Sequence, residues 1–494
     1  MTDVMDLEST DEDGPLHLNG IDALTGLPAV TPMTEEEAAR RAAGGPPPAE
    51  DVGLLRRLWE ALKRPFHSLP DDIDPTNVTA AGWAVVLPTE TPDEVRQAVE
   101  QLIAHRRDHT RVPADRCLIL DYRPGQALAD WLRVLGAHLA DVEPTRLPYY
   151  VVLVGGPEII SFEFQTLLDM NYAVGRIAFD RPEQYRRYVE GLIAYEKAKA
   201  APNGREVLYW GPRNRADRAT QLSADCLIRP LFEGIPATGD QTALPAIAEQ
   251  RRFRSRCLGG SAATRANLLE PLHAAEPSSR PAFLFTASHG LEWPNGHENQ
   301  LAQQGALLCQ DWPGPGVPPR SEHCVRAADI GDDARLHGLV AFLFACHGAG
   351  TPAFDQFLAD RAKGPVPIAG RPFVAALPQQ LLSHANGPAL AVFGHVERAW
   401  GYSIRPRGLG PRLRPFRNLI SRVLKGEPVG HATKDLSDRF TAASAHLNLL
   451  NDPSYLGARP PASELAALWV ECNDARNYVL LGDPAARLRV DLLA

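Results

Sequence analysis

Two short apolar runs of this chain each lead to a side chain that could do chemistry. The run at 283–287 leads to His289 and Gly290, and the run at 340–345 leads to Cys346. Cys346 follows His289 by 57 positions (346 − 289), a spacing that fits two strands joined by a helix and a long loop. A thiol beside an imidazole forms a cysteine nucleophile with its base. The spacing therefore predicts a catalytic dyad of Cys346 and His289.

A second histidine, His347, competes with His289 for the role of base because it follows Cys346 directly. Adjacent residues of an extended chain point to opposite faces, so His347 should not reach the thiol easily, and His289 is favoured. Gly348 and Gly350 let the backbone approach a substrate carbonyl closely, and their amides can donate to it. The alternative for Cys346 is a buried core cysteine without a chemical role.

The two runs belong to a chain in which strand and helix patterns alternate. Expected strands span 83–88, 117–120, 150–154, 174–179, 207–210, 282–287, 339–345 and 389–394, and expected helices include 128–139, 182–199, 218–232, 416–425 and 433–451. Such alternation is typical of a doubly wound α/β fold with a mostly parallel sheet. Open sheets of this kind place their chemistry at the carboxyl ends of the strands, where His289 and Cys346 would lie side by side.

Four segments are expected along the chain. Residues 1–75 read as an acidic, largely disordered tail with a short helix, since 1–50 offers little apolar surface to offset its ordering entropy. Residues 76–202 and 203–400 read as two stacked α/β units, the second of which is catalytic. Residues 401–494 read as a mainly helical extension.

Composition excludes several classes of function. The chain has 494 residues, of which 44% are hydrophobic, and a net charge of −9, which argues against a nucleic-acid partner. No apolar run reaches the roughly 18–20 residues of a membrane span, so no membrane insertion is expected. The first fourteen residues hold six acids and no base, unlike a secretory signal, and a cytoplasmic protein is expected.

Neither a metal nor a cofactor is expected. The seven cysteines are scattered without C-x-x-C spacing, which argues against a disulfide framework or a zinc site. The chain also has no P-loop, no convincing dinucleotide fingerprint and no H-E-x-x-H motif, and the G-x-S-x-G elbow of hydrolases is absent.

Three further acids are candidates for a substrate pocket. Asp311 follows the loop after His289, and it either shapes a specificity pocket or caps a turn. Asp355 and Glu397 have the same two interpretations.

Five stretches in order resemble the gingipain-like (C25-type) branch of the caspase-fold cysteine peptidases, a superfamily that also includes bacterial CHAT domains. They are 149–157 (YYVVLVGGP), 172–177 (YAVGRI), 289–290 (HG), 345–346 (AC) and 478–488 (YVLLGDPAARL). The resemblance covers about 80–494. It implies a caspase-like three-layer α/β sandwich, and a thiolate that attacks a peptide carbonyl without a metal.

Residue roles also follow from the resemblance. It implies that Cys346 is the nucleophile, that His289 is the base, and that backbone amides near Gly290 and Cys346 form the oxyanion hole. In some relatives an acid before the VGRI-type strand orients the histidine, and Asp169 or Asn171 offers that here. The residue preferred before the cleaved bond stays open.

The expected function is therefore a cytoplasmic cysteine endopeptidase acting on a protein or peptide. By analogy it belongs to a bacterial defence or cell-death module with a dedicated partner protein. The alternative is a catalytically silent CHAT-like scaffold that binds a partner protein through the same cleft. A small-molecule hydrolase or transferase ranks last, because no cofactor motif supports it.

Overall fold

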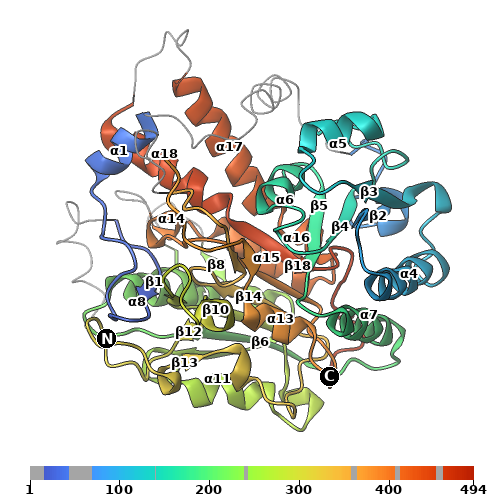
Figure 1. Ribbon diagram of the computed structural model, residues 1–494. Coiled ribbons are helices and arrows are strands. Elements are labelled where there is room, and N and C mark those ends of the chain that lie inside the picture. The colour runs from blue at the N-terminus through green and yellow to red at the C-terminus, as the bar shows by residue number, and fades with distance from the viewer. Residues whose placement is uncertain are drawn as a thin grey trace.

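A ten-stranded sheet with helices on both faces dominates the molecule (Figure 1). The chain is described here from a computed structural model, which covers residues 16–43, 69–139, 141–237, 243–357, 364–405, 412–451 and 460–494. The expected three-layer α/β architecture with a mostly parallel sheet is confirmed.

The sheet consists of two parallel halves. Its order is β3 (Cys117–Tyr122), β2 (Trp83–Pro88), β4 (Tyr150–Val154), β5 (Ala173–Ile177), β18 (Tyr478–Gly482), β17 (Ala391–His395), β14 (Val340–Phe344), β10 (Pro281–Ala287), β6 (Gly204–Gly211) and β9 (Arg254–Gly259). Every neighbouring pair is parallel except β17 and β18. Strands from 76–202 and 203–400 thus fall in opposite halves, and β18 from the last segment joins them. The domain boundaries themselves stay predictions.

Central strands are apolar throughout because both faces of the sheet are covered. All residues of β10 and β14 are buried. Phe285 and Phe342, which are neighbours across these two strands, stack with ring centroids 4.7 Å apart. Double burial explains why these strands read as continuous apolar runs rather than as alternating patterns. The packing around β10 and β14 therefore holds in place the residues that follow them, His289 and Cys346.

A buried ion cluster holds the segment after β18 against the helices of the first half. The Arg106 guanidinium, in α4 (Asp93–Asp108), lies 2.8 Å from the carboxylate of Glu196, in α7 (Pro182–Lys197), and 2.7 Å from that of Asp483. The indole of Trp83 also donates to Asp483, at 3.1 Å. Asp483, which directly follows β18, therefore ties the sheet to the outer helix α4.

The N-terminal segment corrects one expectation. Residues 1–50 were expected to be disordered, but residues 16–43 form β1 (Gly20–Asp22) and α1 (Glu35–Ala43). Leu16, Leu18, Ile21 and Met33 are buried, and this apolar surface offsets the ordering entropy. In Figure 1 the blue segment rises to α1, which packs beside α18 (Ala462–Ala475). The acidic stretch 1–14 lies outside the described residues, and so does 44–68.

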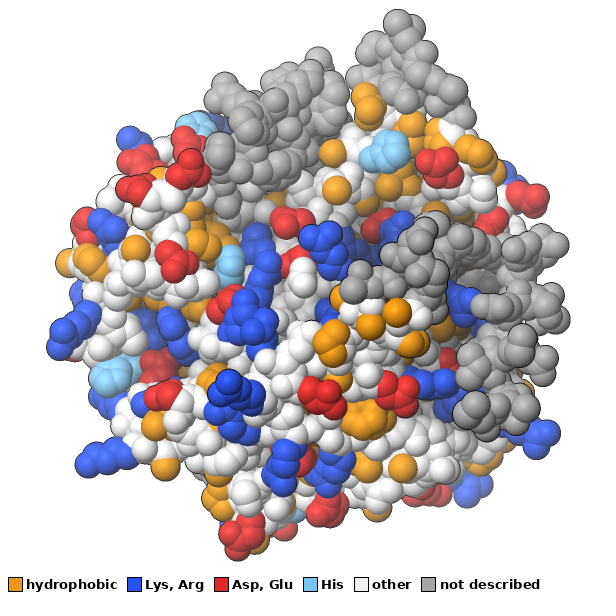
Figure 2. Space-filling view, turned by 180° about the vertical axis from the view of Figure 1, so that it is seen from behind, with side chains coloured by type: hydrophobic (Ala, Val, Ile, Leu, Met, Phe, Trp, Pro, Cys, Tyr) orange, Lys and Arg blue, Asp and Glu red, His pale blue; other side chains and the backbone are white. Residues whose placement is uncertain are grey.

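Charged side chains of both signs are interspersed over the face shown in Figure 2. Within the described ranges, no helix combines the length and apolar character that a membrane crossing needs. The same ranges contain no group of three or more His, Cys, Asp or Glu side chains placed to hold a metal ion. All seven cysteines are described, and all are free.

Candidate active site

The two apolar runs deliver His289 and Cys346 to the same edge of the sheet. Strands β10 and β14 pair in parallel with Ala287 opposite Phe344, so both end at the same level. The Ser288 amide still donates to the Phe344 carbonyl, at 3.0 Å. Parallel pairing therefore brings together two residues that are far apart in the sequence.

His289 is held by a carboxylate that the sequence interpretation missed. Its Nε2 lies 2.7 Å from Oδ2 of Asp217, and both side chains are buried. The Thr220 hydroxyl donates to the same oxygen, at 2.8 Å. Burial raises the pKa of Asp217, but the attraction of His289 and these hydrogen bonds outweigh burial and lower that pKa overall. An ionised Asp217 thus fixes the imidazole by its Nε2.

Asp217 takes the place expected for Asp169 or Asn171, and that expectation is corrected. Asp169 accepts from the Val174 amide at 3.0 Å and from the Ser437 hydroxyl, on the far side of β18 from His289. Asn171 follows α6 (Phe162–Asp169) in the same region. Both residues belong to the first half of the sheet, whereas β6, which leads to Asp217, is the direct neighbour of β10.

The Cys346 thiol is fully buried in a polar backbone environment. The Ala399 amide donates to its Sγ, at 3.2 Å. Burial raises the pKa of Cys346 above its ordinary value, and the Ala399 amide opposes that shift. The thiol is therefore protonated at neutral pH in this state, and it needs a base to become a nucleophile.

His347 is engaged elsewhere. Its backbone turns into the left-handed region with φ of 57°, so the chain is no longer extended there. Its Nδ1 lies 3.1 Å from the Thr351 hydroxyl, and its Nε2 lies 3.4 Å from the carboxylate of Glu292. Both ring nitrogens thus face partners other than the thiol, which leaves His289 as the candidate base.

Two backbone amides of the site converge on one carbonyl oxygen. The amides of Gly290 and Cys346 both donate to the carbonyl of Asn19, at 3.0 and 3.3 Å. A side chain at Gly290 is impossible without a shift, because a Cβ there would lie 1.9 Å from the carbonyl oxygen of Cys346. The His-Gly and Cys backbones are therefore in direct contact and form a two-donor cradle for a peptide carbonyl.

Asp355 and Glu397 lie together in a buried cluster around Arg398. The guanidinium is 2.7 Å from Asp355, 3.2 Å from Glu397 and 3.0 Å from Glu292. Burial raises the pKa of Glu292, but Arg398 and then His347 lower it to about 2. The cluster packs behind His347, whose amide donates to the Glu397 carbonyl at 2.6 Å. A substrate role for Asp355 and Glu397 stays a prediction.

Asp311 takes the position of a cap. Its carboxylate accepts from the backbone amide of Arg265, at 2.7 Å, where α11 (Arg265–Leu272) begins. Of the two interpretations for Asp311, the described contacts favour the cap.

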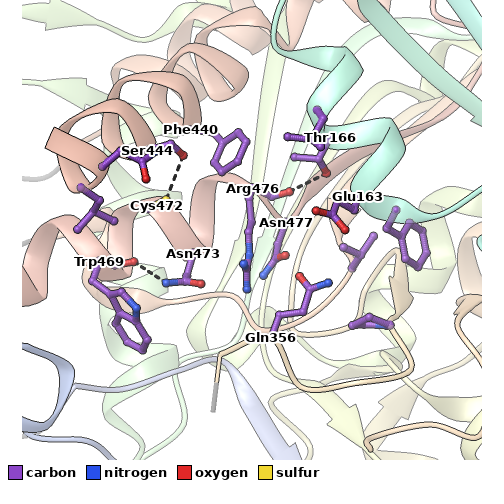
Figure 3. A pocket seen from close by; sticks show the side chains of 16 residues that line it. Glu163, Thr166, Gln356, Phe440, Ser444, Trp469, Cys472, Asn473, Arg476 and Asn477 are labelled. Atoms are coloured by element: carbon purple, nitrogen blue, oxygen red, sulfur yellow. Dashed lines mark hydrogen bonds between the residues drawn. The ribbon is translucent and has the colours of Figure 1, made fainter. Parts of the chain in front are cut away.

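A separate cavity lies between α6, α17 (Lys434–Leu450) and α18, with 352–356 at one side (Figure 3). The Cys472 thiol on its wall lies 3.3 Å from the Ser444 hydroxyl. Neither Cys346 nor His289 lines this cavity. The Cys346 thiol instead lies against Gly20, where an added Cβ would come within 3.1 Å of its Sγ.

Comparisons with known proteins were made by sequence and by structure. No protein-family model and no curated protein matches this chain. Similar solved structures include a complex of the pro- and mature domains of RgpB from Porphyromonas gingivalis, with 11% identity and a TM-score of 0.43, covering 83% of this chain and 80% of that one. The Arg-specific cysteine proteinase gingipain R has 11% identity and a TM-score of 0.41, with coverages of 85% and 81%.

A third similar structure is the separase–securin complex of Saccharomyces cerevisiae, with 11% identity and a TM-score of 0.31. It covers 91% of this chain and 24% of that one. The two gingipain structures belong to the group that the resemblance names, and all three structures concern the fold alone. Because every TM-score is below 0.5, the activity of this protein has to be inferred from its own contacts.

Proposed function

We propose that this protein is a cysteine endopeptidase in which Cys346 is the nucleophile and His289 the base. The observation that carries the proposal is the convergence of the Gly290 and Cys346 amides on one peptide carbonyl oxygen beside the buried thiol. Such paired donors stabilise the negative charge that develops on a carbonyl oxygen under attack. A structural cysteine has no need of this arrangement.

Proton transfer follows from how His289 is held. Its Nε2 is bound to Asp217, and among the described residues no group hydrogen-bonds its buried Nδ1. We assign Nδ1 to take the proton from the Cys346 thiol and to pass it to the leaving amine. The thiolate then forms a thioester with the carbonyl carbon as the C–N bond breaks. Water hydrolyses the thioester and restores the thiol.

The pKa of Cys346 agrees with this division of roles. Because burial raises that pKa, the free thiol is unreactive until His289 accepts its proton. The Ala399 amide at 3.2 Å is placed to stabilise the thiolate once it forms.

The wider setting is part of the proposal. From the resemblance to gingipain-like cysteine peptidases, we propose a cytoplasmic enzyme that acts on a protein or peptide. We place it in a bacterial defence or cell-death module with a dedicated partner protein. The second candidate is the catalytically silent scaffold, for which the full burial of Cys346 is the favouring observation.

The test uses wild-type protein, Cys346→Ala and the matched control Cys472→Ala, whose thiol lines the separate cavity. Each is incubated with a fluorogenic peptide library that varies the residue before the scissile bond, and with an electrophilic thiol probe. We expect hydrolysis by wild type and Cys472→Ala, and none by Cys346→Ala. Equal rates in all three proteins would contradict the dyad. No hydrolysis and no labelling of Cys346 in wild type would favour the scaffold.

A further inference from the structure

The segment 16–22 of this chain lies in the cleft as a bound peptide substrate would. The Asn19 carbonyl accepts from both donors of the cradle, the amides of Gly290 and Cys346. The Asn19 amide donates in turn to the Ala399 carbonyl, at 2.9 Å. Hydrogen bonds therefore hold Asn19 at its amide and at its carbonyl, and they align the peptide bond between Asn19 and Gly20.

Both flanks of this peptide unit are held as strands. Upstream, Leu18 forms an antiparallel bridge with Trp400. Downstream, β1 pairs in parallel with β11 (Gly290–Glu292), with Gly20 opposite Gly290. Added strands of this kind are a common way for a protein to hold an extended peptide. The Asn19–Gly20 bond thus lies at the centre of a strand that spans the site.

The thiol is directly beside that bond. A Cβ built on Gly20 would lie 3.1 Å from Sγ of Cys346 and 3.4 Å from its Cβ. A side chain at this position would crowd the sulfur, so the residue after the aligned carbonyl has to be small. Attack on a carbonyl carbon requires this kind of proximity between the reacting groups.

On the basis of the proposed function, we infer that residues 16–22 are an intramolecular substrate and that Cys346 cleaves the Asn19–Gly20 bond. The sulfur adds to the Asn19 carbonyl carbon while His289 holds the thiol proton. The C–N bond breaks, Gly20 leaves as a free amine with that proton, and an Asn19 thioester remains. Water hydrolyses the thioester to the Asn19 carboxylate and the Cys346 thiol.

The side chain of Asn19 reveals the specificity of the site. It is fully buried, and its Nδ2 donates to the Ser223 hydroxyl at 2.7 Å and to the Ser288 carbonyl at 3.3 Å. The Ser223 hydroxyl itself donates to the Ala219 carbonyl, at 3.0 Å, and so offers a lone pair to Asn19. An aspartate side chain in place of Asn19 would have no proton to donate to the Ser223 hydroxyl or the Ser288 carbonyl. The pocket therefore selects asparagine over aspartate before the scissile bond.

The first experiment follows the full-length chain by intact mass and by sequencing of new N-termini. We expect wild type to yield fragments 1–19 and 20–494, and Cys346→Ala to stay whole. The exposed Asn295–Gly296 pair is an internal control, because it has the same two residue types outside the cleft. Cleavage at both pairs, or at Asn19 in Cys346→Ala, would overturn the inference.

The second experiment tests the pocket in trans, so that a folding defect in a variant cannot mimic the result. The probe is the octapeptide of residues 16–23, Leu-His-Leu-Asn-Gly-Ile-Asp-Ala, and its analogue with Asp in place of Asn. We expect kcat/KM for the Asp analogue to be at least about 100-fold lower. Ser223→Ala should lower kcat/KM for the Asn peptide by about tenfold and narrow that gap.

Failure of this inference is distinguishable from failure of the proposed function. If the enzyme hydrolyses library peptides only after a residue other than Asn, and Asn19–Gly20 stays intact, the inference is wrong while the peptidase remains. An intact Asn19–Gly20 bond in protein that hydrolyses the Asn peptide would also overturn self-cleavage. If no peptide is cleaved and Cys346 is not labelled, the proposed function itself fails.

Discussion

Replacing Asp217 by Asn removes one charge from the site and one of the side chain's two acceptor oxygens. Both the His289 Nε2 and the Thr220 hydroxyl point at Oδ2, so the carboxamide oxygen, which accepts, should take that position. At an effective dielectric constant of about 20, full charges 2.7 Å apart attract by about 6 kcal/mol, most of which desolvation offsets. Charge-assisted hydrogen bonds are worth about 1.5–3 kcal/mol net.

This range predicts the kinetic effect of Asp217→Asn. Since about 1.4 kcal/mol corresponds to tenfold in rate, kcat/KM should fall by roughly 10- to 200-fold. The loss should be in kcat, because the imidazolium forms only during the reaction. The assay is hydrolysis of the octapeptide of residues 16–23, with single-turnover measurement of thioester formation.

Asp225→Asn is the matched control for Asp217→Asn. Asp225 lies a few residues further along the same helical segment, where it pairs with Arg213 at 3.0 Å. We expect Asp225→Asn to retain wild-type kcat/KM. A wild-type rate in Asp217→Asn would refute the assignment of His289 as a base activated through Asp217, and an equal loss in both variants would point to a general effect of charge.

Three further substitutions test the cradle and the two buried ion clusters. Gly290→Ala forces a shift against the Cys346 carbonyl, and kcat should fall about 100- to 1,000-fold without loss of folding by circular dichroism; an unchanged kcat would contradict the cradle. Burial raises the pKa of Glu196, but Arg106 outweighs burial and lowers it to about 2, so this stabilisation is full above pH 4.5 and is lost as pH falls towards 2. Glu196→Gln should therefore lower the free energy of unfolding, measured by urea titration, by about 3 kcal/mol at pH 7. The difference from wild type should vanish near pH 2, and a difference that does not depend on pH would refute this reasoning. Arg398→Ala removes the guanidinium that three buried acids share and should lower the free energy of unfolding by about 3–5 kcal/mol, whereas a loss below about 1 kcal/mol would mean that the cluster is hydrated.

The sequence by itself determined the central strands and the placement of His289 and Cys346 at the ends of two of them. Apolar runs such as 283–287 and 340–345 predict strands buried on both faces, because a parallel sheet excludes water from both sides. Their shared direction then places His289 and Cys346 at one edge, since parallel strands end together. Periodicity and strand direction are local properties, and they can be read without tertiary contacts.

The role of Asp217 could not be predicted from these local properties. The only available signal was an acid shortly after β6, and nothing in the sequence states that β6 is the neighbour of β10 rather than of another strand. The resemblance points instead to Asp169 or Asn171, and Asp169 lies across β18 in the other half of the sheet. Strand order depends on the packing of the whole sheet, so the partner of His289 could not be predicted from local pattern.

Asn19 is the plainest case of a residue that only the tertiary structure placed. Residues 1–50 read as a tail because they are acidic at first and then run through Ala, Gly and Pro at 42–48, which offers little apolar surface to bury. The cleft supplies what the segment lacks: two amides and the Ala399 carbonyl for its backbone, and buried acceptors for its carboxamide. An extended strand without internal hydrogen bonds is stable only where another part of the chain satisfies its backbone. For Asn19 those partners are Gly290, Cys346 and Ala399, all more than 270 residues away in the sequence.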